Sequence, residues 1–402
     1  MGSLKRIVGP VKLQILEIFT GCHPHFVWEN TQNELTRHIP VFLFHTVRPD
    51  EFEEKLKFLS DNGYTTVSAD DAGRIISGED FVRPRSVMLT FDDGRKSLWS
   101  VAFPLLQKYG FKATAFINPG QVSPEYCMSP RLGDPGLNDT LNAWIEQCDT
   151  SETPVISWQE ARIMQETGVV DMQCHMDTHL RVPVKPVIET FLNPGMIERY
   201  YFKFEIPLMP GVPPGKEGCW NQLGAPVYTS SPGHMDRPMY IEDSALRREC
   251  VNYVARHGGG EFFLNRHWKG KLRDIVKQFK KNHGSTGKYE SAGDMRKRIF
   301  DNAARAKEKI ESQLQGKPVR HLSFPWGRGC GLAVRLLKEA GYLSAYWRII
   351  PRKPLNRAGD NPFFLVRLKH DFIWRLPGKG RKSLPEIFGY KLARRLAGNI
   401  DY

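Results

Sequence analysis

The sequence has few of the features that mark specialised classes of protein. Its 402 residues include only 7 cysteines, an odd number with no Cys-x-x-Cys pair, which argues against a zinc ribbon or a disulfide framework. No apolar run approaches the roughly 20 residues that a membrane-spanning helix needs. Glycine and proline number only 35 and 28, while 41% of the residues are hydrophobic, which excludes collagen-like and disordered chains. The composition therefore predicts a globular chain that does not span a bilayer.

The N-terminal segment also lacks the pattern of a cleaved signal peptide. Lys12, Gln14 and Glu17 interrupt its apolar stretch, and no small-residue cleavage site follows. We interpret this segment as uncleaved and expect a cytoplasmic protein.

Positive charge is abundant and concentrated near the C-terminus. The net charge is +13, and the stretch from Arg367 to Arg395 holds nine Lys/Arg residues against two acidic ones. No DNA or RNA motif accompanies this charge, so nucleic acid is not an expected partner. The segment 389–396 mixes Tyr and Leu with Lys and Arg, as helices on anionic membrane surfaces do. A solvated basic surface is the alternative interpretation, and both stay open.

Short apolar runs alternate with helical segments along most of the chain. This alternation predicts an α/β fold, a parallel (β/α) barrel of seven or eight strands. The strand-like runs are residues 41–47, 64–69, 86–91, 113–118, 169–175, 320–324, 343–347 and 363–368.

The alternation is interrupted by a long insertion between two barrel strands. It is rich in Pro, Gly, basic residues and aromatics, and its length predicts a lid over the site or a packed subdomain. Its aromatic residues include Tyr200, Tyr201, Trp220, Tyr228, Tyr240 and Trp268. We therefore divide the chain into an N-terminal arm (1–39), a barrel (40–182 and 291–371), the insertion (183–290) and a basic C-terminal tail (372–402).

Polar residues follow two of the predicted strands at the points where these end. Asp92 and Asp93 follow residues 86–91, and His175 and His179 follow another strand at i, i+4 spacing. Functional groups of parallel barrels lie at the C-terminal ends of the strands. Carboxylates and histidines together suit zinc or another late transition metal with a base nearby. Alternatively, one of the two carboxylates caps a helix, and the two histidines are ordinary surface or core residues.

These motifs carry a family resemblance. The sequences TFDDG (90–94) and HMDTH (175–179), followed by FPWG (324–327), resemble the motifs of the polysaccharide deacetylases, carbohydrate esterase family 4, also called the NodB-like homology domain. The similarity covers residues 40–182 and 295–368. It implies a distorted (β/α) barrel and a metal-dependent hydrolase that removes an acetyl group from an N-acetylated sugar.

The resemblance also implies roles for the motif residues. Asp93, His175 and His179 are expected to bind a divalent metal, with Zn²⁺ the expected ion and Co²⁺, Ni²⁺ or Mn²⁺ as alternatives. Asp92 is expected to be the general base that takes a proton from the water attacking the acetyl carbonyl. Many relatives orient this base with an arginine before the third motif's proline, and residues 322–327 contain none. Another group must therefore orient Asp92.

The sequence offers two candidates for the last residue of the site, and both lie near the end of the same strand. Many relatives supply a histidine from a late Leu-x-His, which His370 fits, whereas one branch of the family ends this strand with an arginine, which Arg367 fits. Side chains alternate along a strand, so only one of the two points inward. We favour His370 as the catalytic residue, because the leaving amine needs a donor that titrates near neutrality, and we keep Arg367 as a substrate contact.

Two further strand ends carry candidate substrate-binding residues. His45 is an alternative proton donor or a substrate contact, and a backbone-bonded histidine is the structural alternative. Trp326 is suited to form an apolar wall for a sugar ring or an acetyl methyl group, unless it packs in the core.

The expected substrate is an N-acetylated polysaccharide, oligosaccharide or lipid-linked glycan precursor. With no signal peptide and a basic tail, we expect the protein to work in the cytoplasm, peripherally at the inner membrane face. The alternatives are a hydrolase of another linear or cyclic amide on the same barrel, and a non-catalytic glycan-binding relative.

Overall fold

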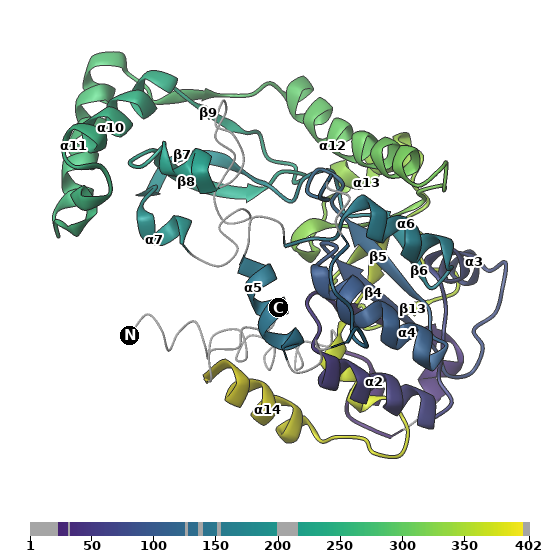
Figure 1. The fold of residues 1–402 in the computed structure, drawn as a ribbon. Coiled ribbons are helices and arrows are strands. Elements are labelled where there is room, and N and C mark those ends of the chain that lie inside the picture. Colours follow the sequence, from purple (N-terminus) through teal and green to yellow (C-terminus); the bar gives the residue numbers. More distant parts are fainter. Residues whose placement is uncertain are drawn as a thin grey trace.

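The main part of the molecule is a nearly closed parallel barrel, seen at the right of Figure 1. The computed structural model describes residues 23–30, 33–124, 128–135, 140–150, 154–198 and 216–396. Eight strands lie in the order β14-β12-β11-β6-β5-β4-β2-β15, each parallel to its neighbours. They are β2 (Val41–Phe44), β4 (Ser86–Asp92), β5 (Ala113–Ile117), β6 (Val170–Cys174), β11 (His321–Ser323), β12 (Ser344–Trp347), β14 (Leu365–Val366) and β15 (Leu368–Lys369). The predicted barrel is confirmed.

The segment from β14 to β15 closes the barrel. These two strands are separated only by Arg367. β14 pairs with β12 and β15 pairs with β2, so one short stretch of chain joins the last strands of the barrel to the first. A further short strand, β3 (Thr65–Thr66), pairs with β4 outside this path.

Helices cover the outside of the barrel, and the strands are accordingly buried on both faces. Every residue of β2, β4 and β5 is buried, as expected of parallel strands with covered faces. Local sequence sets the helix starts: α3 and α6 each begin with a serine and an acidic residue in a capping box. The covering helices are α2 (Pro49–Asp61), α3 (Ala69–Ser77), α4 (Phe103–Tyr109), α6 (Trp158–Glu166), α12 (Ala292–Gln313) and α13 (Gly331–Glu339).

Several shorter elements connect the barrel strands. They are a π-helical turn η3 (Leu98–Ala102), the helix α5 (Leu141–Thr150), the strand β13 (Asn356–Arg357), and the 3₁₀ turns η5 (Pro325–Gly327) and η6 (Pro362–Phe364). A further 3₁₀ segment, η7 (His370–Arg375), follows the last barrel strand.

The insertion has a hydrophobic core of its own. It contains a hairpin of β7 (Arg181–Phe191) and β8 (Pro226–Pro232), a second pair of strands, β9 (Tyr240–Glu242) and β10 (Gly287–Tyr289), and the helical elements α7 (Pro194–Ile197), α9 (Lys216–Trp220), α10 (Ser244–Arg256), η4 (Gly259–Leu264) and α11 (Trp268–His283). Its buried apolar residues form a cluster separate from the barrel core.

The described part of the insertion forms a packed subdomain. Helices α10 and α11 lie away from the barrel at the upper left of Figure 1. Tyr228 and Tyr240 are buried, Trp268 packs against the insertion's core, and Trp220 is 40% exposed. Tyr200 and Tyr201 lie outside the described residues.

The described parts of the predicted arm and tail contribute to the barrel domain. Phe26 in η1 (His25–Val27) and Phe372 in η7 are buried in the barrel core. The strand β1 (His38–Ile39) follows η2 (Asn33–Thr36) and pairs with β13. Arg375 donates a hydrogen bond to the carbonyl of Val27 at 2.7 Å. Residues on both sides of the predicted domain boundaries at 39 and 372 therefore pack together.

The predicted C-terminal helix is present as α14 (Leu384–Leu396), and its basic groups have partners on the barrel. Lys391 pairs with Asp371 and Arg394 pairs with Glu51. Leu384 and Phe388 pack against the barrel core. Charges that we expected to face an anionic partner are thus partly neutralised within the chain. None of the helices in the described ranges combines the length and the apolar character that crossing a membrane requires.

A substitution in the insertion tests whether its core is independent. Phe279 is 1% exposed within the insertion's cluster. We expect Phe279→Ala to cost about 3 to 5 kcal/mol of unfolding free energy in the insertion, because it leaves a cavity. Amide hydrogen exchange under increasing urea measures this, with the exposed Lys277→Ala on the same helix as control. Equal loss of protection in the barrel strands would contradict an independent core.

Candidate metal centre

The predicted site residues gather at one end of the barrel because all of its strands point the same way. Asp92 is the last residue of β4 and Asp93 follows it, His175 follows β6, Ser323 ends β11, and Arg367 lies between β14 and β15. The C-terminal ends of parallel strands form the functional face of such barrels.

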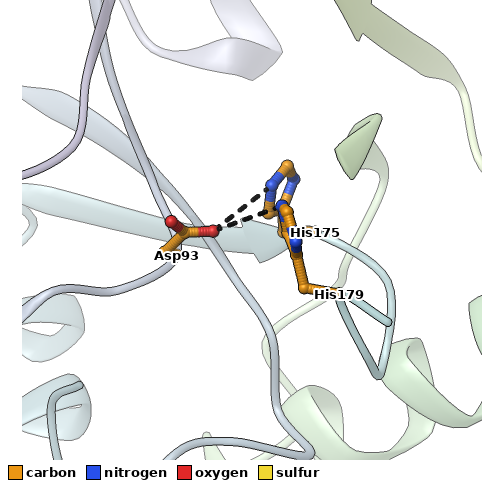
Figure 2. Close-up of side chains that lie close together, drawn as sticks. All are labelled: Asp93, His175 and His179. Carbon is orange, nitrogen blue, oxygen red and sulfur yellow. Dashed lines mark ion pairs between the residues drawn. The ribbon is translucent and has the colours of Figure 1, made fainter. Parts of the chain in front are cut away.

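Three side chains converge on a common point (Figure 2). Asp93 Oδ1 lies 3.6 Å from His175 Nε2 and 3.7 Å from His179 Nε2. Ligand atoms about 2.1 Å from one tetrahedral ion are about 3.4 Å apart, so these separations fit a shared cation. All three residues are buried, and among the described residues Asp93 Oδ1 has no hydrogen-bond donor. The structure thus brings together the three predicted ligands.

The protonation states of these residues also suit metal binding. The Nδ1–H of His175 donates to the carbonyl oxygen of Ser323 at 2.8 Å, which leaves the Nε2 lone pair facing the centre. Burial lowers the pKa of His179 to about 3, so its ring is neutral. Burial alone would raise the pKa of Asp93, but His179 and the Arg95 guanidinium hold it well below its ordinary value.

Arg95 is a site residue that sequence reasoning missed. It is 3% exposed, and its Nη2 lies 3.3 Å from Asp93 Oδ2. The two oxygens of Asp93 are therefore divided between Arg95 on one side and the histidines on the other. Its position directly after the TFDDG motif is the one available sequence signal.

Asp92 lies beside the three ligands and is held by Arg367. Arg367 Nη1 and Nη2 donate to the two carboxylate oxygens at 2.6 and 2.7 Å. Ser323 Oγ accepts from Arg367 at 2.7 Å and donates to Asp92 at 3.2 Å. Burial would raise the pKa of Asp92, but Arg367 and His175 outweigh it and keep the pKa below its ordinary value. Asp92 is thus an oriented, ionised carboxylate, with its Oδ2 at 3.8 Å from His175 Nε2.

Arg367 was expected to contact the substrate, but the structure places its guanidinium fully buried and bound to Asp92 and Ser323. It is therefore the group outside residues 322–327 that orients the Asp92 carboxylate. Along the closing segment of alternating side chains, Arg367 takes the inward position.

The structure does not bring His370, the predicted catalytic residue, to the candidate centre. His370 begins η7 and stacks on Phe44, with 4.9 Å between ring centroids and 12° between planes. Burial lowers its pKa to about 3, and the charges that act on it are those of Asp371 and nearby lysines. None of the described contacts of His370 is to a residue of the candidate centre.

His45 and Trp326 both lie at the site. His45 follows β2, and the charges of Asp93 and Asp92 act on it, although burial lowers its pKa. The Trp326 ring lies 4.9 Å from the His179 ring and is 37% exposed. Its φ of 62° is in the left-handed region, as is that of Asp93 at 69°, and strain of this kind is typical of functional sites.

The loop that carries the two histidines is fastened to helix α12. Lys309 Nζ contacts both carboxylate oxygens of Asp177, at 2.8 and 3.0 Å. The backbone N–H of Asp177 donates to the Asn302 carbonyl, and the N–H of Thr178 donates to Asn302 Oδ1. Nothing in the sequence signalled this support, because Lys309 lies 132 residues from its partner.

Part of the chain matches a known family. Residues 81–193 match the family model described as polysaccharide deacetylase. The chain is 33% identical to the YxkH protein of Bacillus subtilis (strain 168), whose name places it among polysaccharide deacetylases, over 87 residues, or 20% of this chain and 31% of that protein. It is 31% identical to the poly-beta-1,6-N-acetyl-D-glucosamine N-deacetylase of Escherichia coli (strain K12) over 176 residues, or 44% of this chain and 23% of that protein. The chain thus spans less than a third of the length of either relative.

Solved structures with a similar chain path include a de-N-acetylase from Aggregatibacter actinomycetemcomitans, with a TM-score of 0.48 and 17% identity over 82% of this chain and 94% of that one. The deacetylase domain of BpsB from Bordetella bronchiseptica has a TM-score of 0.48 and 15% identity over 84% and 97%.

Removing Arg367 tests the role of its ion pair. In Arg367→Met the Asp92 carboxylate stays buried without its charged partner, which we expect to cost about 3 to 5 kcal/mol of unfolding free energy at pH 7. In the wild type the lowered pKa of Asp92 stabilises the fold above the unfolded value of about 3.9, and this contribution is lost as the pH falls. The difference between variant and wild type should therefore shrink at low pH. Urea denaturation at several pH values, with the exposed Arg357→Met as control, measures it, and a pH-independent difference would contradict the assignment.

Removing Lys309 tests the support of the ligand loop. We expect Lys309→Met to weaken divalent metal binding about 10- to 100-fold, as is typical when a group that supports ligands is lost. Competition with a chromophoric chelator measures the affinity for Zn²⁺. The control is Lys297→Met, an exposed lysine on the same helix. Equal affinities of the two variants would show that Asp177 holds the loop without Lys309.

Proposed function

Residues 81–193 belong to the polysaccharide deacetylase family, and from this premise we propose that the chain is a metal-dependent hydrolase that removes the acetyl group from an N-acetylated sugar. The observation that carries the proposal is an ionised carboxylate, Asp92, fixed by Arg367 next to three side chains that fit one cation. A base beside a metal with open positions is what hydrolysis of an amide requires.

The donor set favours zinc as the proposed metal. One carboxylate and two histidines are ligands that Zn²⁺ binds in catalytic sites with an open position. When bound, such a cation supplies Lewis acidity, which makes water more acidic and stabilises negative charge on a carbonyl oxygen. Asp93, His175 and His179 would hold it.

Asp92 would accept the proton of the attacking water. Arg367 keeps the carboxylate ionised and fixes its direction, and Ser323 bonds to both groups. Each carboxylate oxygen has two lone-pair positions, so the bond to Arg367 leaves Asp92 able to accept another hydrogen. Arg367 is therefore a positioning residue in this proposal.

His45 is the proposed proton donor to the leaving amine. It is near enough to both aspartates for their charges to act on its pKa, whereas His370 packs against Phe44. Trp326 next to His179 supplies an apolar wall for the sugar ring or the acetyl methyl group.

We propose N-acetylglucosamine polymers or their lipid-linked precursors as the substrate class. The name of the Escherichia coli relative, which acts on poly-beta-1,6-N-acetyl-D-glucosamine, supports the sugar. A cytoplasmic location at the inner membrane face stays a prediction. The exposed Tyr390 and Leu396 of α14 support it, while the internal ion pairs of Lys391 and Arg394 leave less charge for anionic lipids.

Separate substitutions of the two adjacent aspartates test this proposal. We expect Asp92→Asn to keep Zn²⁺ affinity and to lose about 10²- to 10⁴-fold in acetate release, the usual contribution of a general base. Asp93→Asn should lose metal binding and activity together. The measurements are acetate release from N-acetylglucosamine oligomers and nucleotide- or lipid-linked N-acetyl sugars, and Zn²⁺ titration. The control is Asp274→Asn, which changes an exposed carboxylate.

Two outcomes would reject the proposed activity. If Asp92→Asn and Asp93→Asn release acetate at the wild-type rate, the site is not the catalytic centre. If the wild type binds Zn²⁺ and hydrolyses linear or cyclic amides but no acetylated sugar, the reaction is an amide hydrolysis of another kind.

A further inference from the structure

The β7–β8 hairpin of the insertion contacts the loop that carries Trp326. The Arg181 guanidinium lies over the Trp326 ring, 5.1 Å from its centroid. Arg181 is itself held by β8, because its Nε donates to Ser230 Oγ at 2.9 Å and its Nη2 donates to the Ser230 carbonyl at 2.7 Å. A cation over an indole is attracted to the ring face. Through Arg181, the hairpin therefore contacts one face of the Trp326 ring and restrains it.

A second contact lies at the far end of the same loop. His234, in the turn after β8, donates from Nε2–H to the Arg328 carbonyl at 2.6 Å. Its ring stacks on Phe324 with 5.4 Å between centroids, and Cys330 Sγ donates to its backbone carbonyl at 3.5 Å. His234 is 2% exposed, and burial lowers its pKa to about 4, so the ring stays neutral at pH 7. Residues on both sides of Trp326 are therefore bound to the insertion.

The turn that carries His234 is in turn fixed to the barrel. The Arg298 guanidinium on α12 donates to the Gly233 carbonyl and pairs with Glu290 at 2.5 Å. The position of the hairpin is thus set by a helix of the barrel domain. The hairpin can in turn fix the loop of Trp326, because each of these contacts is made by a buried or half-buried group.

The loop needs such support because its own conformation is unfavourable. Trp326 has a φ of 62°, a conformation that is strained for a non-glycine residue and persists only where the surroundings enforce it. Its side chain is also 37% exposed, so core packing does not hold it. The ring nevertheless lies 4.9 Å from that of His179, a proposed ligand.

We propose that the insertion determines substrate affinity at the metal centre, with Arg181 and His234 as positioning residues that hold Trp326 where a sugar ring would pack. This inference rests on the proposed function, because it assumes that Trp326 contacts an N-acetylated sugar. It assigns a role to the insertion that is distinct from that of a lid.

Kinetics separate positioning from chemistry. We expect Arg181→Met and His234→Phe to raise KM for N-acetylglucosamine oligomers about 5- to 20-fold, the range that loss of one cation–π contact or hydrogen bond produces. kcat and Zn²⁺ affinity should change less than about 2-fold. Arg181→Lys keeps the charge but loses the planar stacking, so its KM should lie between wild type and Arg181→Met. The matched control is Lys185→Met, an exposed lysine on the same strand.

Hydrogen exchange provides a readout that does not need activity. Amides of residues 324–330 should exchange at least about 5-fold faster in Arg181→Met and His234→Phe than in Lys185→Met, because the loop loses a restraint. Faster exchange in a protein that deacetylates no sugar would reject the proposed function and keep the positioning role.

Two results would overturn the inference. One is unchanged KM and unchanged exchange in both variants, which would show that the loop holds Trp326 without the hairpin. The other is a fall in kcat together with lost Zn²⁺ at constant KM, which would show that Arg181 acts through His179.

Discussion

The bidentate ion pair between Asp92 and Arg367 is the interaction on which the rest of the site depends. Burying two charges costs several kcal/mol for each, and only good geometry with further hydrogen bonds offsets that cost. Both carboxylate oxygens are bonded to the guanidinium, and Ser323 bonds to both partners. The same pair links β4 to the segment that closes the barrel, so one interaction both orients the Asp92 carboxylate and joins the two sides of the barrel wall.

The loops at the candidate metal centre are held in place from outside the barrel. The histidine loop is attached to α12 through Asp177 and Lys309, and the loop of Trp326 is attached to the insertion. Asp93, Met176 and Trp326 all have positive φ values, and such strain persists only where the surroundings enforce it. Helix α12 supplies such surroundings for the loop of Met176, and the insertion supplies them for the loop of Trp326.

The barrel and the gathering of the candidate ligands at one of its ends could be predicted from sequence, because both follow from local rules. Strand and helix periodicity gives the alternation, and parallel strands bring Asp93 and His175 to one end. Arg367 and His370 could not be separated, because alternation shows that they face opposite ways but not which of them faces inward. Lys309 gave no signal, since its contact with Asp177 depends on how a long helix lies over the barrel. The ion pairs of the tail could not be predicted either, because composition gives the number of charged residues but not which residues pair with them.

The closing segment has a consequence for the order in which the molecule is made. Asp92 and Arg367 are separated by 275 residues, and the insertion lies between them. On the ribosome, the first half of the barrel is synthesised long before the guanidinium that neutralises its aspartate, and domains fold N-terminal parts first during synthesis. Until the chain reaches Lys369, Asp92 has no guanidinium partner and the barrel wall lacks its last strand. The nascent protein therefore carries this ion pair half made until the end of the barrel sequence is synthesised.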